Sequence, residues 1–242
     1  MIKHASITNK GNRAYNEDTI GMFSNRKVSG FIVCDGLGGH GMGDVASSLA
    51  VDLFRNDLES CRAINKEIIE KFFAKAHNKL LTEQKRLNAS NKMKTTAAML
   101  LLDKAYAYIG HIGDSRVYAF NKISVIHQTR DHSVPEALRH AGMISESEIR
   151  KHPDRNKLLK VLGGPGEKVE GSVSDGIRLS DTRAFLLCSD GFWEYINEEK
   201  MCHLLTVSAS PDDWLHWMTE EVVRNGKDYN MDNFSAIAVW NM

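Results

Sequence analysis

The order of apolar and polar residues predicts strands and helices that are grouped in blocks along the chain. Apolar runs bounded by polar turns predict the strands. The expected strands are 2–8, 18–23, 30–34, 95–102, 105–109, 116–120, 124–128, 171–173, 184–188 and 234–240. Because these strands do not alternate strictly with helices, they favour antiparallel sheets covered by helices over a doubly wound parallel sheet.

Apolar residues at helical spacing predict helices between the blocks of strands. The first helix is expected to begin near Asp44, which we predict to be its N-cap, and a second to cover about 66–87. Segment 129–165 differs, because it carries charge, histidine and two short helical signals at 134–141 and 145–151. We interpret this segment as a surface insertion, and the alternative is an ordinary helical layer.

Length and composition fit a single domain over 1–242, since four prolines and no Ser/Gly-rich linker leave no marked boundary. The 31 basic and 31 acidic residues balance, which argues against a nucleic-acid partner. No apolar stretch approaches the ~20 residues of a membrane span, and the N-terminus lacks an apolar signal core. We therefore expect a cytoplasmic location and no membrane partner. Nothing predicts an obligate oligomer, so we expect a monomer.

Two apolar runs end on the same dipeptide. One run leads into Asp35-Gly36 and the other into Asp190-Gly191, and each is typical of a buried strand that ends on a carboxylate. Bringing carboxylates together at the edge of a core costs roughly several kcal/mol per ion unless a cation offsets the charge. The two strand ends therefore predict a metal site.

Further acidic residues stand at other turns and strand ends, namely Glu17, Asp18, Asp114 and Asp232. Each alone is typical of a turn or a cap, but together they favour an all-oxygen site. Oxygen ligands without a Cys/His set favour Mg²⁺ or Mn²⁺ over Zn²⁺. The glycine-rich loop 36–43 has neither the Lys-Ser/Thr ending of a P-loop nor a GxGxxG register, which argues against a nucleotide site.

Seven short motifs resemble, in this order, those of the PPM/PP2C family of metal-dependent Ser/Thr protein phosphatases, in the form of its bacterial branch. They are RAYNED at 13–18, DGLGGHGMG at 35–43, TT at 95–96, GHIGDSR at 110–116, TRDHS at 129–133, SDG at 189–191 and DN at 232–233. The match runs from about residue 5 to 240. It implies an α+β fold, a four-layer α/β/β/α sandwich of two antiparallel sheets flanked by helices, with a flap insertion that segment 129–165 matches.

The resemblance implies two Mn²⁺ or Mg²⁺ ions and a role for each matching acidic residue. Asp35 would bridge both ions, and Gly36 would give its backbone carbonyl to one of them. Asp190 and Asp232 would hold the other ion. Asp114 with Asp190 resembles the pair that binds a third ion in bacterial members.

The remaining motif residues would act around the ions. Glu17 and Asp18 would act mostly through metal-bound waters, and Arg13 would bind the substrate phosphate. Some family members place a histidine, the proton donor to the leaving group, directly after the Asp-Gly pair, whereas this chain has Leu37 there. We expect His40 to support the glycine loop, and a role in the reaction is the alternative.

The resemblance implies hydrolysis of phosphoserine and phosphothreonine on proteins. A hydroxide that bridges the two ions would attack phosphorus in line, with no covalent phosphoenzyme. The implied partners are phosphorylated proteins and the Ser/Thr kinase whose action is reversed. The alternatives are an inactive binding module, which the full ligand set argues against, and a phosphatase dedicated to one pathway.

We expect His132 to be a surface histidine, and a role in positioning the flap is the alternative.

Overall fold

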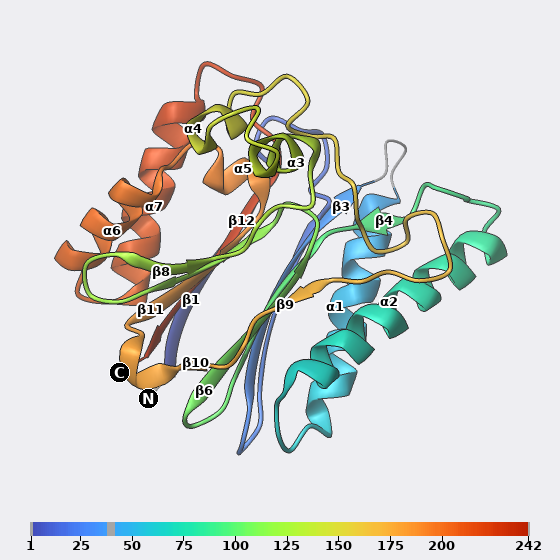
Figure 1. The fold of residues 1–242 in the computed structure, drawn as a ribbon, viewed down its shortest axis with the longest axis horizontal. Helices are drawn as coiled ribbons and strands as arrows, with labels where there is room; N and C mark the ends of the chain where they lie inside the picture. The colour runs from blue at the N-terminus through green and yellow to red at the C-terminus, as the bar shows by residue number, and fades with distance from the viewer. Residues whose placement is uncertain (1, 38–41, 242) are drawn as a thin grey trace.

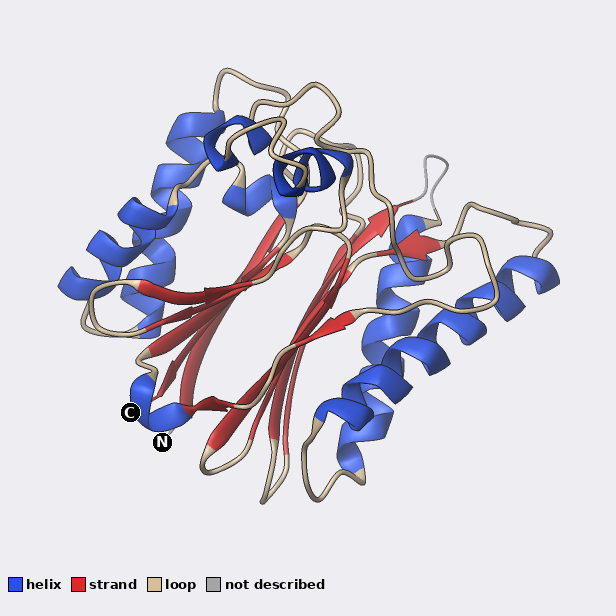
Figure 2. Cartoon of the chain, viewed as in Figure 1, coloured by secondary structure: helices blue, strands red, loops and turns tan. Residues whose placement is uncertain are grey.

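The computed structural model describes residues 2–37 and 42–241 of the chain. Two antiparallel sheets face each other, and helices cover the outer face of each sheet (Figure 1, Figure 2). The layers follow in the order helices, sheet, sheet, helices. This arrangement confirms the predicted four-layer α/β/β/α architecture of class α+β.

The first sheet has five strands in the order β1, β12, β11, β7, β8. Their bounds are β1 (Ile2–Asn9), β7 (Arg116–Phe120), β8 (Val125–Gln128), β11 (Ala184–Cys188) and β12 (Phe234–Asn241). The first strand of the chain pairs with the last, with Ile2 opposite Asn241.

The second sheet follows the order β10, β6, β5, β3, β2, with β4 paired to β3 and β9 paired to β6. The bounds are β2 (Asp18–Ser24), β3 (Ser29–Leu37), β4 (Lys94–Thr95), β5 (Ala97–Leu102), β6 (Tyr106–Ile112), β9 (Ser172–Val173) and β10 (Ile177–Arg178). Both sheets are therefore built from segments that are far apart in the sequence.

Four helices form the outer layers. α1 (Gly43–Glu59) and α2 (Lys66–Arg86) pack on the second sheet, and α6 (Glu198–Val207) and α7 (Pro211–Gly226) pack on the first (Figure 1). The short helices are α3 (Val134–His140), α4 (Glu146–Ile149), α5 (Asp190–Trp193) and η1 (Leu179–Asp181). Within the described ranges, no helix has the length and apolar character needed to cross a membrane.

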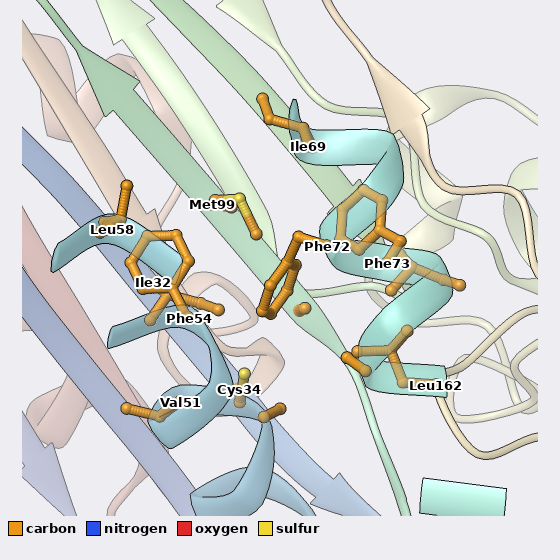
Figure 3. Packing of buried hydrophobic residues seen from close by; sticks show 14 of the residues in the cluster. Ile32, Cys34, Val51, Phe54, Leu58, Ile69, Phe72, Phe73, Met99 and Leu162 are labelled. Carbon is orange, nitrogen blue, oxygen red and sulfur yellow. The ribbon is translucent and has the colours of Figure 1, made fainter. Parts of the chain in front are cut away.

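Alternate residues of the central strands pack into different layers of the core. In β3, Ile32 and Cys34 face the phenylalanines of α1 and α2, as Figure 3 shows. Phe31 and Val33 belong instead to the cluster between the two sheets. Because both faces of the strand are buried, its apolar run is continuous and does not alternate with polar residues.

β3 continues beyond its predicted end, through Asp35 and Gly36. It does so because Asp35 pairs with Asp18 of β2, and Gly36 pairs with Thr95 of β4. The strand predicted over 95–102 is divided for a related reason, since β4 pairs at the very end of β3 while β5 pairs further back.

The predicted N-cap of α1 is wrong. The helix begins after Met42, which makes no side-chain cap, and Asp44 lies within the first turn. The free N–H of Gly43 donates instead to Oε1 of Glu17 at 3.2 Å. A residue from a different part of the chain therefore supplies the cap.

Candidate metal centre

The predicted site residues gather around one cavity of ≈ 810 Å³ at the end of the two sheets. Those that line it are Arg13, Glu17, Asp35, Gly36, Asp114, Asp190 and Asp232. Asp18 does not line the cavity; it is buried opposite Asp35 in the β2–β3 pair. His40 lies outside the described residues.

The end of β3 brings Asp35 and Gly36 to the wall of the cavity. The N–H of Asp35 donates to Oγ1 of Thr96 at 3.0 Å, and its carbonyl accepts the Thr96 N–H at 2.9 Å. A Cβ at Gly36 would lie only 2.2 Å from the carbonyl oxygen of Gly43. Only glycine therefore allows β3 and the start of α1 to approach this closely.

Three more aspartates reach the cavity from three further connections. β11 ends at Cys188, before the carboxylate on which the strand was expected to end, and Asp190 then begins α5, so Gly191 lies in a helical turn. Asp232 stands just before β12, and Asp114 lies in the turn between β6 and β7. Strand ends of both sheets thus supply carboxylates to one space.

These buried carboxylates destabilise one another when they are ionised. Burial raises the pKa of Asp35 and of Asp114 well above the usual range, and neighbouring carboxylates raise both further. Burial, together with repulsion from Asp232, raises the pKa of Asp190 to about 6. Burial also raises the pKa of Asp18 to about 7. Near neutral pH the cluster therefore requires protons or cations.

The chemistry of these residues fits a divalent cation that prefers oxygen ligands. Oδ1 of Asp18 and Oδ1 of Asp190 are buried without a hydrogen-bond partner. Carboxylate oxygens of this kind are the ligands that Mg²⁺ and Mn²⁺ prefer. Within the described part of the chain, no three His, Cys, Asp or Glu side chains are already grouped to hold one ion. The fit is therefore one of charge and donor type.

Arg13 is already engaged with the acidic cluster. Its Nη2 donates to Oδ2 of Asp232 at 2.7 Å, and the two side chains keep 48% and 38% of their surface exposed. A guanidinium thus offsets one carboxylate at the mouth of the cavity. The same planar group can donate two parallel hydrogen bonds to a phosphate.

Asn233 organises the segment that carries Arg13 and Glu17. Its Oδ1 accepts the N–H of Glu17 at 2.8 Å, and its Nδ2 donates to the carbonyls of Lys10 and Tyr15, each at 2.9 Å. The sequence placed Asn233 in a motif but gave it no role. The only signal was a polar residue at the start of a buried strand.

Two further contacts near the cavity were not predicted. Oγ of Ser189 donates to Oδ2 of Asp18 at 2.8 Å, which leaves the other oxygen of that carboxylate without a partner. Nε1 of Trp193 donates to the carbonyl of Asp114 at 2.9 Å. These bonds join residues that are far apart in the sequence, so no local pattern could reveal them.

Comparison with known families gives one match over most of the chain. The family model described as Protein phosphatase 2C matches residues 8–226. The serine/threonine phosphatase stp of Listeria welshimeri is 33% identical over 215 residues, which cover 86% of this chain and 84% of that protein. The serine/threonine protein phosphatase PstP of Mycobacterium tuberculosis is 26% identical over 238 residues, which cover 96% of this chain and 44% of that protein.

Solved structures share the whole fold. The crystal structure of serine/threonine phosphatase Stp1 from Staphylococcus aureus has a TM-score of 0.91 at 27% identity and covers 100% of this chain and 96% of its own. The catalytic domain of PstP in complex with two manganese ions has a TM-score of 0.82 at 22% identity, with 99% and 97% covered. The two antiparallel sheets and their outer helices are thus common to these proteins.

Proposed function

The chain belongs to the protein phosphatase 2C family and is a metal-dependent protein-serine/threonine phosphatase, and we propose that its reaction takes place in the carboxylate-lined cavity. One observation carries this proposal: carboxylates from separate connections of both sheets and one arginine meet around the same space. No cation of the chain balances most of that charge among the described residues. Bound Mn²⁺ or Mg²⁺ ions would supply the missing charge.

Five residues would hold the ions. Asp35, the carbonyl of Gly36, Asp190 and Asp232 would hold two of them, and Asp114 with Asp190 would hold a third. Glu17 and Asp18 would act through water. When bound, the two ions make water a nucleophile near neutral pH and offset negative charge on the phosphoryl group.

Arg13 binds and orients the substrate phosphate. It lies at the mouth of the cavity, half exposed, and donates to Asp232, whose charge the bound ions would also offset. The planar guanidinium would donate to two phosphate oxygens. This orients phosphorus for direct in-line attack by water, so no covalent phosphoenzyme is needed.

The leaving serine or threonine oxygen takes its proton from water. Leu37 lines the cavity at the position that follows Asp35-Gly36, and its side chain has no proton to give.

Segment 129–165 serves as a flap beside the cavity within a single domain, and its Asn156 and Leu158 line that cavity.

The substrates are phosphorylated proteins, and the reaction reverses that of a Ser/Thr kinase. This assignment follows the bacterial relatives, which are named serine/threonine phosphatases. We further propose that the protein acts in the cytoplasm as a monomer.

Hydrolysis of a phosphothreonine peptide tests the proposal directly. Phosphate release should require Mn²⁺ or Mg²⁺ and stop in excess EDTA, and it should be absent with Asp190→Asn. Peptide binding without phosphate release, whether Mn²⁺, Mg²⁺ or EDTA is present, would instead identify an inactive binding module. A phosphoserine peptide of the same sequence compares the two substrate classes.

A further inference from the structure

His132 makes two hydrogen bonds to the residue directly before Asp114. Its backbone N–H donates to the carbonyl of Gly113 at 2.9 Å, and the N–H of Gly113 donates to its ring Nδ1 at 3.2 Å. His132 belongs to the beginning of segment 129–165, 19 positions from Gly113. The expectation of a plain surface histidine is therefore wrong, because both its backbone and its ring hold one turn.

That turn depends on Gly113. Its φ of +98° lies in a region that other residues rarely adopt, and a Cβ would lie 2.5 Å from Cγ2 of Thr96. A glycine in a turn has more conformational freedom than any other residue. Hydrogen bonds from outside the turn are thus needed to keep one geometry, and His132 supplies them on both polar groups of Gly113.

The ring of His132 is itself held in place. Since Nδ1 accepts a hydrogen bond, Nε2 carries the hydrogen and donates to Oγ of Ser172 at 3.0 Å. The ring also stacks on His111, with centroids 4.6 Å apart and planes inclined by 5°. Burial and the neighbouring His111 lower the pKa of His132 to about 3, so the ring is neutral and Nδ1 stays an acceptor.

Asp114 is held from its other side by α5. Its carbonyl accepts the indole N–H of Trp193 at 2.9 Å, and its carboxylate lines the catalytic cavity. The backbone on both sides of the Asp114 carboxylate is thus held, at Gly113 by His132 and at Asp114 itself by Trp193.

We propose that His132 is a positioning residue of the phosphatase reaction, which fixes Gly113 so that Asp114 stays directed into the catalytic cavity. The proposal rests on the proposed function of that cavity. The carbonyl of His132 also accepts the N–H of Leu159 at 2.7 Å. One residue thus connects the two ends of segment 129–165 and the turn that carries Asp114.

Three substitutions at one position test this role. His132→Ala removes the ring acceptor, His132→Asn keeps an acceptor oxygen near the place of Nδ1, and His132→Gln carries its acceptor one bond further out. The control is His127→Ala, because His127 lies on the neighbouring strand β8 and makes no hydrogen bond to this turn among the described residues. The readouts are kcat and KM for p-nitrophenyl phosphate over a Mn²⁺ titration, Mn²⁺ binding by calorimetry, and thermal unfolding.

We expect His132→Ala to lower kcat about 10-fold and to weaken the weakest class of Mn²⁺ site, with KM for the phosphoester changed less than about twofold. His132→Asn should recover most of both losses, His132→Gln should not, and the control should match the wild type. Equal losses in the Asn and Gln variants, or losses that follow the melting temperature alone, would overturn the proposal. If His132→Ala does not fold, the Asn and Gln pair still decides.

The same experiment separates this inference from the proposed function. A wild-type protein without Mn²⁺-dependent hydrolysis would refute the proposed function. In that case the calorimetric comparison of the Asn and Gln variants would still test whether His132 positions Asp114.

Discussion

Two groups of buried charges lie on either side of α5, and only one is neutralised within the chain. At the end of α5, Trp193 stacks on Arg116, with its ring centroid 3.6 Å from the guanidinium carbon. Nε and Nη2 of Arg116 donate to both oxygens of Asp131, each at 2.8 Å. At the start of α5, Asp190 lines a cavity where buried carboxylates face one another.

Both groups contain buried charges, such as Asp131 in one and Asp114 in the other, so burial alone does not distinguish a structural charge from a functional one. Charge balance does. The Arg116–Asp131 pair satisfies its hydrogen-bonding groups internally and needs nothing from solution. The carboxylate cluster keeps raised pKa values and a buried oxygen without a partner, which indicates that it binds a cation.

The largest expected effect comes from removing one charge of the cavity. Asp190→Asn should reduce Mn²⁺-dependent hydrolysis of p-nitrophenyl phosphate by at least about 100-fold, because a proposed metal ligand is lost. The metal-free variant should melt at the same temperature as the wild type or higher, since the amide removes a repulsive buried charge. Enzyme kinetics and calorimetric melting in EDTA measure the two effects.

Asp52→Asn is the matched control for that substitution, because Asp52 is exposed on α1 and does not line the cavity. It should change neither quantity. Retained activity in Asp190→Asn would remove Asp190 from the proposed ligands, and the contrast between the two groups of charges would lose its basis.

The other side of the comparison predicts a loss of stability. Asp131→Asn leaves the guanidinium of Arg116 buried beside a neutral amide, which should lower the free energy of unfolding by about 3–5 kcal/mol. Urea unfolding measures it. Asp154→Asn removes the acid of an exposed pair with Lys157 and should cost less than about 1 kcal/mol. Similar costs for the two variants would contradict the assignment of Arg116–Asp131 as a structural pair.

The sequence revealed the acidic cluster more readily than the neutral pair. Asp35 and Asp190 each follow a continuous apolar run, so a local pattern marked them as charges at the edge of a core. Arg116 and Asp131 also stand in recognisable motifs. Nothing local indicates that they meet, because pairing depends on how segment 129–165 packs against β7.

The same limit explains which parts of the fold were predicted. The grouping of strands and helices was visible in the order of apolar runs and predicted antiparallel sheets covered by helices, whereas the order of the four layers came from the family resemblance. The length of β3 depends on its pairing with β2 and β4. The cap of α1 comes from Glu17, 26 positions from Gly43. Tertiary contacts set the register of the strands and the helix caps that come from distant residues, and the spacing of apolar residues along the chain does not reveal those contacts.

The pH dependence of the metal-free protein sharpens the contrast. The folded pKa values of about 6 for Asp190 and about 7 for Asp18 lie above those of unfolded aspartates. Their stabilising contribution is complete below the unfolded pKa and is lost as the pH rises through the folded values. In EDTA, stability should therefore fall between pH 5 and pH 8, by on the order of a few kcal/mol.

Added Mn²⁺ should remove most of that fall, because a cation favours the ionised carboxylates that the metal-free fold disfavours. Melting temperatures at pH 5, 6, 7 and 8, with EDTA or with Mn²⁺, make the comparison. Asp190→Asn should flatten the EDTA curve. Stability in EDTA that rises over this pH range would show that the carboxylates are already compensated within the chain.

The smallest expected effect on stability concerns the exposed pair of Arg13 and Asp232. Arg13→Ala should change the free energy of unfolding by less than about 1 kcal/mol, because both side chains are well solvated. Its KM for phosphopeptides should nevertheless rise about 10-fold, since two donors to the phosphate are lost. Arg13→Lys keeps the charge but not the planar fork, so it should recover only part of that loss. Lost turnover at unchanged KM would instead mean that Arg13 interacts with the phosphoryl group only in the transition state. A large loss of stability would show that the Arg13–Asp232 pair is a structural contact, like Arg116–Asp131.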